Sequence, residues 1–294
     1  MKTFRLGLLA LFAGLLAAVA AFPDAALARP PVWIVRDKDS ELILFGSVHL
    51  LPPGMDWRPP ALTRALKAAD DVWFELPIDP STEAETQRLA AELGVLAPDQ
   101  SLFKLLPKAD GERLIRVAEK YGADVAVLDR LKPWLADVAL SAAAYKKAGA
   151  DGQDGVEKAV AAAVPAGARR RAFETAQDQI NILAGAPMAD QIASLAETLE
   201  EMETKPDEFD ILLRAWMAGD LKALDREALA PLRTASPDLF RRLVTDRNAH
   251  WTQVLDARLK GKGKTVVVVG MGHLIGPDGV PARLRALGYQ VEGP

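Results

Sequence analysis

The segment 265–269 (TVVVV) constrains the fold of this chain more than any other part of the sequence. Five consecutive β-branched residues favour a strand, and because no polar residues alternate with them, we expect that strand to be buried on both faces. Strands of this kind lie in the middle of sheets that carry helices on both sides. The segment therefore predicts an α/β fold with this strand at its centre.

The other strand-like segments cluster near the two ends of the 294-residue chain. Residues 31–36 and 41–45 flank a turn-forming tetrapeptide and predict a hairpin, while residues 71–76 end at Pro77. Residues 289–292 predict a last strand. We therefore expect one mixed α/β (α+β) domain over residues 29–294, with a central sheet built from N- and C-terminal strands.

A helical insertion over about residues 81–235 fills the middle of the chain, which is rich in Ala, Leu, Glu, Lys and Arg. A short strand-like segment at 171–174 interrupts it. A further helix is expected from the Ser-Pro pair at 236–237 to about Lys260, with Ser236 as its N-cap. The helices predicted inside the insertion cover 81–94, 108–121, 134–147, 155–163, 188–203, 206–218 and 220–228.

The first 28 residues have the pattern of an export signal. Lys2 and Arg5 precede an uncharged apolar run at 6–22, and small residues at 26–28 suit cleavage near Ala28. The alternative is a retained membrane anchor, because about 17 apolar residues is the shortest length that spans a bilayer. We expect a periplasmic or secreted protein that meets the membrane only through this segment.

Composition excludes several classes of protein. The 36 basic and 40 acidic residues give a net charge of −4, whereas a dedicated nucleic-acid-binding domain is usually basic, so no nucleic-acid partner is expected. The absence of cysteine excludes disulfides, thiolate metal sites and a cysteine nucleophile. Nothing in the sequence indicates the oligomeric state.

Two segments share the pattern of a strand followed by Gly-x-x-His: ELILFGSVH at 41–49 and KTVVVVGMGH at 264–273. Ligands of α/β proteins bind beyond the carboxyl ends of strands, and glycine lets the backbone pass close to them. Gly46 would direct His49 into such a crevice, and Gly270 and Gly272 would do the same for His273. The alternative is that both histidines only satisfy loop backbone groups.

Glu75 is the third candidate because it ends the apolar run 72–74. A buried carboxylate is costly unless it is paired or binds a metal. Two imidazoles and a carboxylate can hold a divalent cation and leave positions open for water. A Glu75 side chain that simply faces solvent is the alternative.

The predicted helix 236–260 places Arg247 and Asn248 inside its apolar stripe. A charged residue there requires an anionic partner. Arg247 could orient Glu75, polarise a substrate carbonyl or form an interhelical ion pair. Three residues of the insertion, Asp154, Glu174 and Gln179, could support the same crevice, although Asp154 could instead cap the helix that follows it.

These motifs, in this order and spacing, resemble the TraB/GumN family, which is related to the Tiki metalloproteases and more distantly to erythromycin esterases. The resemblance covers essentially the whole chain after residue 28, with Gln153 as one small departure. It implies an α/β core with a helical insertion and an active-site set of His49, His273 and Glu75. Arg247 and Asn248 match the family's Arg-Asn helix motif near that site. The matching segments are FGSVHL (45–50), FEL (74–76), LKPW (131–134), GQD (152–154), FET (173–175) with Gln179, RNAHW (247–251) and VGMGHL (269–274).

The sequence thus favours an exported hydrolase that acts on a peptide or a small carbonyl-containing substrate. His49, His273 and Glu75 would hold Mn²⁺, Co²⁺ or Zn²⁺, which activates water. Arg247 would stabilise the oxyanion and Asn248 would position the substrate. Two alternatives stay open: a metal-independent esterase-like hydrolase with a histidine base oriented by Glu75, and a non-catalytic periplasmic binding or regulatory protein.

Overall fold

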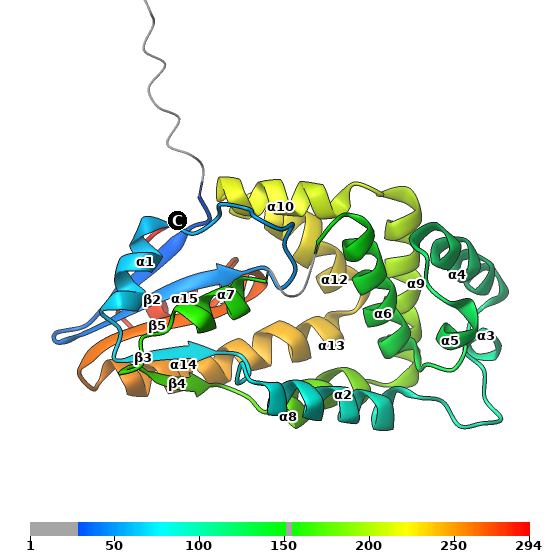
Figure 1. Ribbon diagram of the computed structural model, residues 1–294, viewed down its shortest axis with the longest axis horizontal. Helices are drawn as coiled ribbons and strands as arrows, with labels where there is room; N and C mark the ends of the chain where they lie inside the picture. Colours follow the sequence, from blue (N-terminus) through cyan, green and yellow to red (C-terminus); the bar gives the residue numbers. More distant parts are fainter. Residues whose placement is uncertain (1–28, 151–154) are drawn as a thin grey trace, which may run out of the picture.

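The computed structural model describes residues 29–150 and 155–294 (Figure 1). Its centre is a six-stranded mixed sheet in the order β4-β3-β5-β2-β1-β6. The predicted mixed α/β fold is therefore confirmed. The strands are β1 (Val32–Arg36), β2 (Ser40–Ser47), β3 (Asp71–Phe74), β4 (Arg169–Ala172), β5 (Gly263–Gly270) and β6 (Gln290–Glu292).

Four neighbouring strands of this sheet, β4, β3, β5 and β2, run parallel. Phe74 of β3 is in register with Val268 of β5 and Ala172 of β4, and Phe45 of β2 is in register with the same Val268. The carboxyl ends of all four strands consequently meet at one edge of the sheet. The TVVVV segment lies in β5 between β3 and β2 and is buried throughout, as predicted.

Strand β4 comes from the middle of the chain, so the sheet is not built only from the two ends as the sequence suggested. It pairs with β3 at the edge of the sheet, and its three arginines are exposed. On the opposite side, the antiparallel β1 pairs with β2 and with β6. The insertion therefore contributes a strand that places its next residues at the same sheet edge.

Every helix predicted in the insertion is present, with ends shifted by a few residues. Within the described residues of the insertion, four helices were missed, namely α3, α5, α8 and α12. The longest of them, α8, begins at a capping box formed by Thr175 and Asp178. The helices are α1 (Pro60–Lys67), α2 (Pro80–Gly94), α3 (Leu102–Leu105), α4 (Lys108–Tyr121), α5 (Val125–Leu128), α6 (Pro133–Lys147), α7 (Val156–Ala163), α8 (Ala176–Ala184), α9 (Met188–Thr204), α10 (Glu208–Ala218), α11 (Leu221–Leu224), α12 (Ala230–Ala235), α13 (Pro237–Phe240), α14 (Asp246–Leu259) and α15 (Val280–Ala286).

The helix predicted at 236–260 is present but irregular. Its first part, α13, joins α14 through the π-helical turn η2 (Arg241–Thr245), where Asp246 N–H bonds the Arg241 carbonyl five residues back. Ser236 stands at the N-cap position but makes no capping hydrogen bond. The preceding helix α12 ends directly before it, and the Ser236 N–H bonds the carbonyl of Leu232 in that helix. The predicted Ser236 cap is therefore wrong.

The molecule has a sheet half and a helical half (Figure 1). The sheet packs with α1, α14 and α15 around the main core, whereas α4, α6 and α9 enclose a separate apolar cluster. The arrowheads of β2 and β3 point toward α2, α6 and α13, so the carboxyl edge of the sheet faces the helical half (Figure 1). Within the described ranges, no helix is both long and apolar enough to span a membrane.

Candidate active site

The predicted site residues leave the carboxyl ends of the parallel strands. Glu75 follows β3, Glu174 follows β4 by two residues, and His49 follows β2 by two residues. His273 ends η3 (Met271–His273), the short 3₁₀ turn directly after β5. Arg247 joins this group from α14, close to the π turn. Parallel pairing therefore gathers residues that are up to 224 positions apart in the sequence.

Glu75 accepts three hydrogen bonds, each from a different residue. Its Oε1 accepts a hydrogen bond from the Gly270 N–H at 2.7 Å, and its Oε2 accepts from Arg247 Nη2 at 2.6 Å and from Gln179 Nε2 at 3.0 Å. Burial raises the pKa of Glu75, but the charges of His273, Arg247 and His49 and the Gly270 N–H outweigh burial and lower it to about 2. Glu75 is therefore ionised at neutral pH and does not simply face solvent.

Arg247 bridges the two carboxylates of the site. Its Nε and Nη2 bind Glu174 at 2.8 and 2.9 Å in a bidentate pair, while Nη2 also reaches Glu75. The guanidinium lies 4.7 Å from the Trp251 ring centroid, and the Trp251 indole N–H donates to Glu174 at 2.9 Å. Arg247 thus orients Glu75, which is one of the three roles that the sequence suggested for it. Its ion pairs also join α14 to the ends of β3 and β4.

His273 has a defined tautomer because its neighbours leave one choice. Arg247 Nη1 lies 3.0 Å from His273 Nε2 and is always a donor, so Nε2 must accept. The ring proton is then on Nδ1 and is donated to Asn248 Oδ1 at 2.7 Å. Burial lowers the pKa of His273 to about 4, and Arg247 adds to the effect. His273 is consequently neutral at physiological pH.

Asn248 is fully buried and holds the loop after β5. Its Nδ2 donates to the Asp278 carbonyl at 2.9 Å and to the His273 carbonyl at 3.3 Å. All polar atoms of its amide are therefore directed at protein partners. Asn248 and Arg247 support the site from behind rather than line its cavity.

His49 pairs with a residue that the sequence did not suggest, and not with Glu75 or His273. Its Nδ1 is 2.6 Å from Oε1 of Glu157 in the first turn of α7, and the Ser47 hydroxyl donates to the same oxygen at 2.5 Å. The His49 side chain is 69% exposed, whereas that of Glu157 is 12% exposed. Acidic residues in a first helical turn are common, so nothing in the sequence singled out Glu157.

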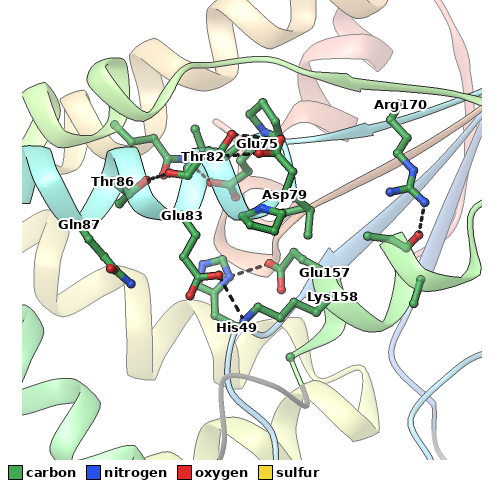
Figure 2. Close-up of a pocket in the computed structure, with 18 residues that line it drawn as sticks. His49, Glu75, Asp79, Thr82, Glu83, Thr86, Gln87, Glu157, Lys158 and Arg170 are labelled. Carbon is green, nitrogen blue, oxygen red and sulfur yellow. Dashed lines mark hydrogen bonds and ion pairs between the residues drawn. The ribbon is translucent and has the colours of Figure 1, made fainter.

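His49 and Glu157 border a cavity of about 700 Å³ between the sheet edge and helices α2 and α7 (Figure 2). His49 and Glu75 line it together with Glu157, Lys158 and Gln179. Figure 2 shows the His49 ring turned toward Glu157, with Lys158 extending beside it. The volume lies within the range of small-molecule sites.

The negative charge of Glu157 raises the pKa of His49 to about 9, although burial opposes this. We expect Glu157→Gln to return the pKa toward the ordinary value of about 6.5. Proton NMR titration of the histidine ring measures this directly, with the exposed His250 as an internal control. An unchanged His49 pKa in the variant would contradict the assignment.

A raised His49 pKa also fixes the sign of a stability effect. Below about pH 6.5 the His49–Glu157 ion pair makes its full contribution to stability. This contribution is lost as the pH rises through about 9. Because His49 is 69% exposed, solvent screening keeps the contribution within about 1 kcal/mol.

The three glycines of the two Gly-x-x-His segments serve close packing. None has a positive φ angle. A Cβ atom on Gly46 would lie 3.0 Å from the Met271 Cα and closer still to its side chain. On Gly270 it would lie 3.2 Å from Glu75 Oε1, and on Gly272 it would lie 3.2 Å from a Leu229 methyl group. The glycines therefore let the ends of β2 and β5 approach each other and the site carboxylate.

The donor groups, as they lie, do not fit a divalent cation. Among residues 29–150 and 155–294, no three side chains of His, Asp or Glu converge to hold a metal ion. The Arg247 guanidinium occupies the lone pairs of His273 Nε2 and Glu75 Oε2, and a permanent cation there opposes a second one. His49 Nε2 is not bound to Glu157, but it would be a single donor and not part of a converging set. Asp154, the other predicted acidic group, lies outside the described residues.

Comparison with known proteins gives one result. No curated protein and no solved structure matches this sequence significantly. The model of the TraB/PrgY/gumN family matches residues 31–293, which include both Gly-x-x-His segments, Glu75 and the Arg-Asn pair of α14. The chain therefore belongs to the TraB/PrgY/gumN family.

Proposed function

We propose that this protein is a hydrolase of peptide or small carbonyl-containing substrates that works without a metal ion. One observation carries the proposal: an exposed histidine, His49, is held by a buried carboxylate, Glu157, at the wall of a 700 Å³ cavity that also contains the ionised Glu75. A carboxylate that fixes one ring nitrogen of a histidine leaves the other free for proton transfer.

His49 is the residue suited to exchange protons with the substrate. The pKa of Glu75 is about 2 and that of His273 about 4, whereas the pKa of His49 is about 9. In the proposed reaction, neutral His49 takes a proton from water as the water oxygen attacks the carbonyl carbon. The imidazolium, stabilised by Glu157, then gives that proton to the leaving group as its bond to carbon breaks.

The remaining charged groups have positioning roles in this proposal. Glu75 orients water in the cavity and is itself fixed by Arg247, Gln179 and the Gly270 N–H. Lys158 lines the cavity beside His49 and supplies positive charge for the developing oxyanion. The oxyanion role first expected for Arg247 and the substrate contact expected for Asn248 pass to cavity-lining residues, because both side chains bind protein groups behind the cavity.

The metal-dependent alternative requires Arg247 to release His273 and Glu75, and calorimetry tests it. Residues 29–294 are stripped of metal and titrated with Mn²⁺, Co²⁺ and Zn²⁺, with His49→Ala and Glu75→Ala as controls. We expect no stoichiometric binding that depends on both residues. Binding that both substitutions abolish would overturn the metal-independent proposal and support the metal-dependent one.

Turnover tests the hydrolase proposal itself. We expect the metal-stripped protein to hydrolyse p-nitrophenyl acetate or leucine p-nitroanilide, and the activity to survive chelation. The rate should rise with pH toward the pKa of His49, because the neutral imidazole is the base. A protein that hydrolyses neither of these probes, in either metal state, would favour the non-catalytic binding role instead.

Export completes the proposal. The apolar segment 6–22 and the small residues before Arg29 support removal of a signal peptide and a periplasmic or secreted protein. These residues lie outside the described part of the chain. N-terminal sequencing of protein recovered from a periplasmic extract would test the cleavage near Ala28.

A further inference from the structure

A second cavity, of about 310 Å³, lies between α6, α9 and the segment α13–η2. We refer to it as the α6 cleft. It shares no lining residue with the cavity that holds His49 and Glu75. Val138 lines it and is 46% exposed, so the cleft opens to solvent. The α6 cleft is therefore separate from the candidate active site.

Trp134 brings a buried hydrogen-bond donor without a partner to the wall of this cleft. It is 5% exposed, and its ring packs in the apolar cluster between α2, α6 and α8. Its indole N–H has no hydrogen-bond partner in the described part of the chain. Four other indole N–H groups each donate to an oxygen, namely those of Trp33, Trp73, Trp216 and Trp251. Packing explains why the Trp134 ring is buried, but it leaves the N–H unexplained.

Gln191 of α9 brings a buried acceptor without a partner to the same cleft. It is 4% exposed, and its Nε2 donates to the Ala186 carbonyl at 2.8 Å. This bond fixes the orientation of the amide, because a flipped amide would set two acceptor oxygens against each other. Gln191 Oε1 has no partner among the described residues. One cleft thus contains a donor and an acceptor on two helices that pack against each other.

The two unpartnered atoms favour a neutral polar group over a charged one. A carboxylate only accepts and would leave Gln191 Oε1 unpaired, whereas an ammonium only donates and would leave the Trp134 N–H unpaired. Asp137 lines the cleft as well, where it accepts from the Ser194 hydroxyl at 3.1 Å. Burial raises the pKa of Asp137 only to about 6, so at neutral pH it is mainly ionised and opposes an anion.

The rest of the cleft indicates a ligand larger than water. One water occupies about 30 Å³, far less than the 310 Å³ of the cleft. Leu50, Leu239 and Leu243 line another part of the wall. Pockets that combine an apolar lining with a few polar groups are typical of small-molecule sites.

From this arrangement we propose that the α6 cleft binds a small neutral molecule with an aliphatic body and a head group that both donates and accepts a hydrogen bond. The Trp134 N–H donates to the head group, and Gln191 Oε1 accepts from it. An amide and an alcohol share this chemistry, and the test separates them. The proposal does not depend on the hydrolase function, and it gives a binding role to Trp134 of the LKPW segment at 131–134.

Four probes with the same branched aliphatic body test the head group: isovaleramide, isoamyl alcohol, isovalerate and isoamylamine. Binding is followed in proton–nitrogen NMR spectra, where each tryptophan indole N–H gives its own signal. The Trp134 signal is the one that is missing in Trp134→Phe. We expect isovaleramide or isoamyl alcohol to shift this signal saturably, and the stronger of the two identifies the head group. Isovalerate and isoamylamine should bind at least about 10-fold more weakly, since each leaves one protein atom unpaired.

Trp134→Phe tests the donor, because phenylalanine keeps an aromatic ring in the cluster and removes the N–H. Calorimetric titration with the better neutral probe should show affinity about 10-fold weaker than for the wild type. Trp33→Phe is the matched control, since Trp33 is a buried tryptophan outside the cleft whose N–H donates to the Pro294 carbonyl. It should bind the probe as the wild type does. Thermal unfolding curves establish that both variants are folded.

Three results would each overturn the proposal. The first is a Trp134 signal that neither neutral probe shifts saturably. The second is equal binding of isovalerate or isoamylamine and the neutral probes. The third is wild-type affinity in a folded Trp134→Phe. If that variant does not fold, the four probes with the wild-type protein still decide between the proposal and its failure.

Discussion

Replacing Arg247 with methionine should lower the free energy of unfolding at pH 7 by about 3–5 kcal/mol. The substitution keeps most of the side-chain volume but leaves two carboxylates without their shared cation. The side chains of Glu75 and Glu174 are only 12% and 8% exposed, so water cannot replace the lost hydrogen bonds well. Urea unfolding followed by circular dichroism measures the change.

Arg241→Met is the matched control for this experiment. Arg241 is half-exposed six residues earlier in the same helical segment and pairs with the exposed Asp246. Its loss should cost less than about 1 kcal/mol, as for surface ion pairs in general. A cost of the same size for Arg247→Met would show that the buried cluster adds little to stability.

The effect of Arg247 should depend on pH with a defined sign. The pKa of Glu75 is lowered from 4.5 to about 2 in the folded protein, so its stabilisation is present above pH 4.5 and lost as the pH falls through about 2. Without Arg247, Glu75 accepts a proton more readily in the folded state. The stability difference between wild type and variant should therefore shrink as the pH is lowered from 7 to 3.

His49→Ala should reduce kcat/KM for a hydrolysed probe about 10²- to 10⁴-fold, the usual loss when a general base is removed. The fold should lose less stability than in Arg247→Met, because the His49 side chain is 69% exposed and Glu157 keeps its hydrogen bond from the Ser47 hydroxyl. The measurement combines p-nitrophenyl acetate hydrolysis with a thermal unfolding curve of the same preparation.

His250→Ala provides the comparison, since His250 is an exposed histidine on α14. It should retain wild-type activity. His273→Ala is a poorer test of catalysis, because His273 is buried against Trp251 with 4.4 Å between ring centroids and its removal also costs stability. Wild-type turnover by His49→Ala would disprove the proposed role of His49.

Local patterns were sufficient to predict the buried central strand and the strand-end residues. The β-branched run of β5 specified a doubly buried strand, and the Gly-x-x-His repeats marked where β2 and β5 end. Since ligands of α/β proteins bind beyond the carboxyl ends of strands, His49, Glu75 and His273 could be grouped at one site. Arg247 was recognisable because a charged residue interrupted an apolar stripe.

Side-chain pairing was much less predictable than placement. The sequence grouped His49 with His273 and Glu75, but the structure pairs His49 with Glu157, which lies 108 positions later on a separate helix. The choice depends on how α7 packs at the end of β2, where Val156 N–H bonds the Val48 carbonyl at 3.2 Å. No periodicity within either segment encodes that contact. The sequence also could not show that the Arg247 side chain binds both His273 and Glu75, because this contact too depends on how separate elements pack.

The π-helical turn before α14 holds one residue more than a regular α-helical turn would. A single deletion within residues 241–245 that restored regular α-helical bonding would therefore leave Arg247 in nearly the same orientation relative to α13. One further inserted residue would instead turn Arg247 by about 100° about the helix axis, and its guanidinium would leave Glu75 and Glu174. In related chains that keep this site, we expect this segment to vary by the loss of one residue and not by the gain of one.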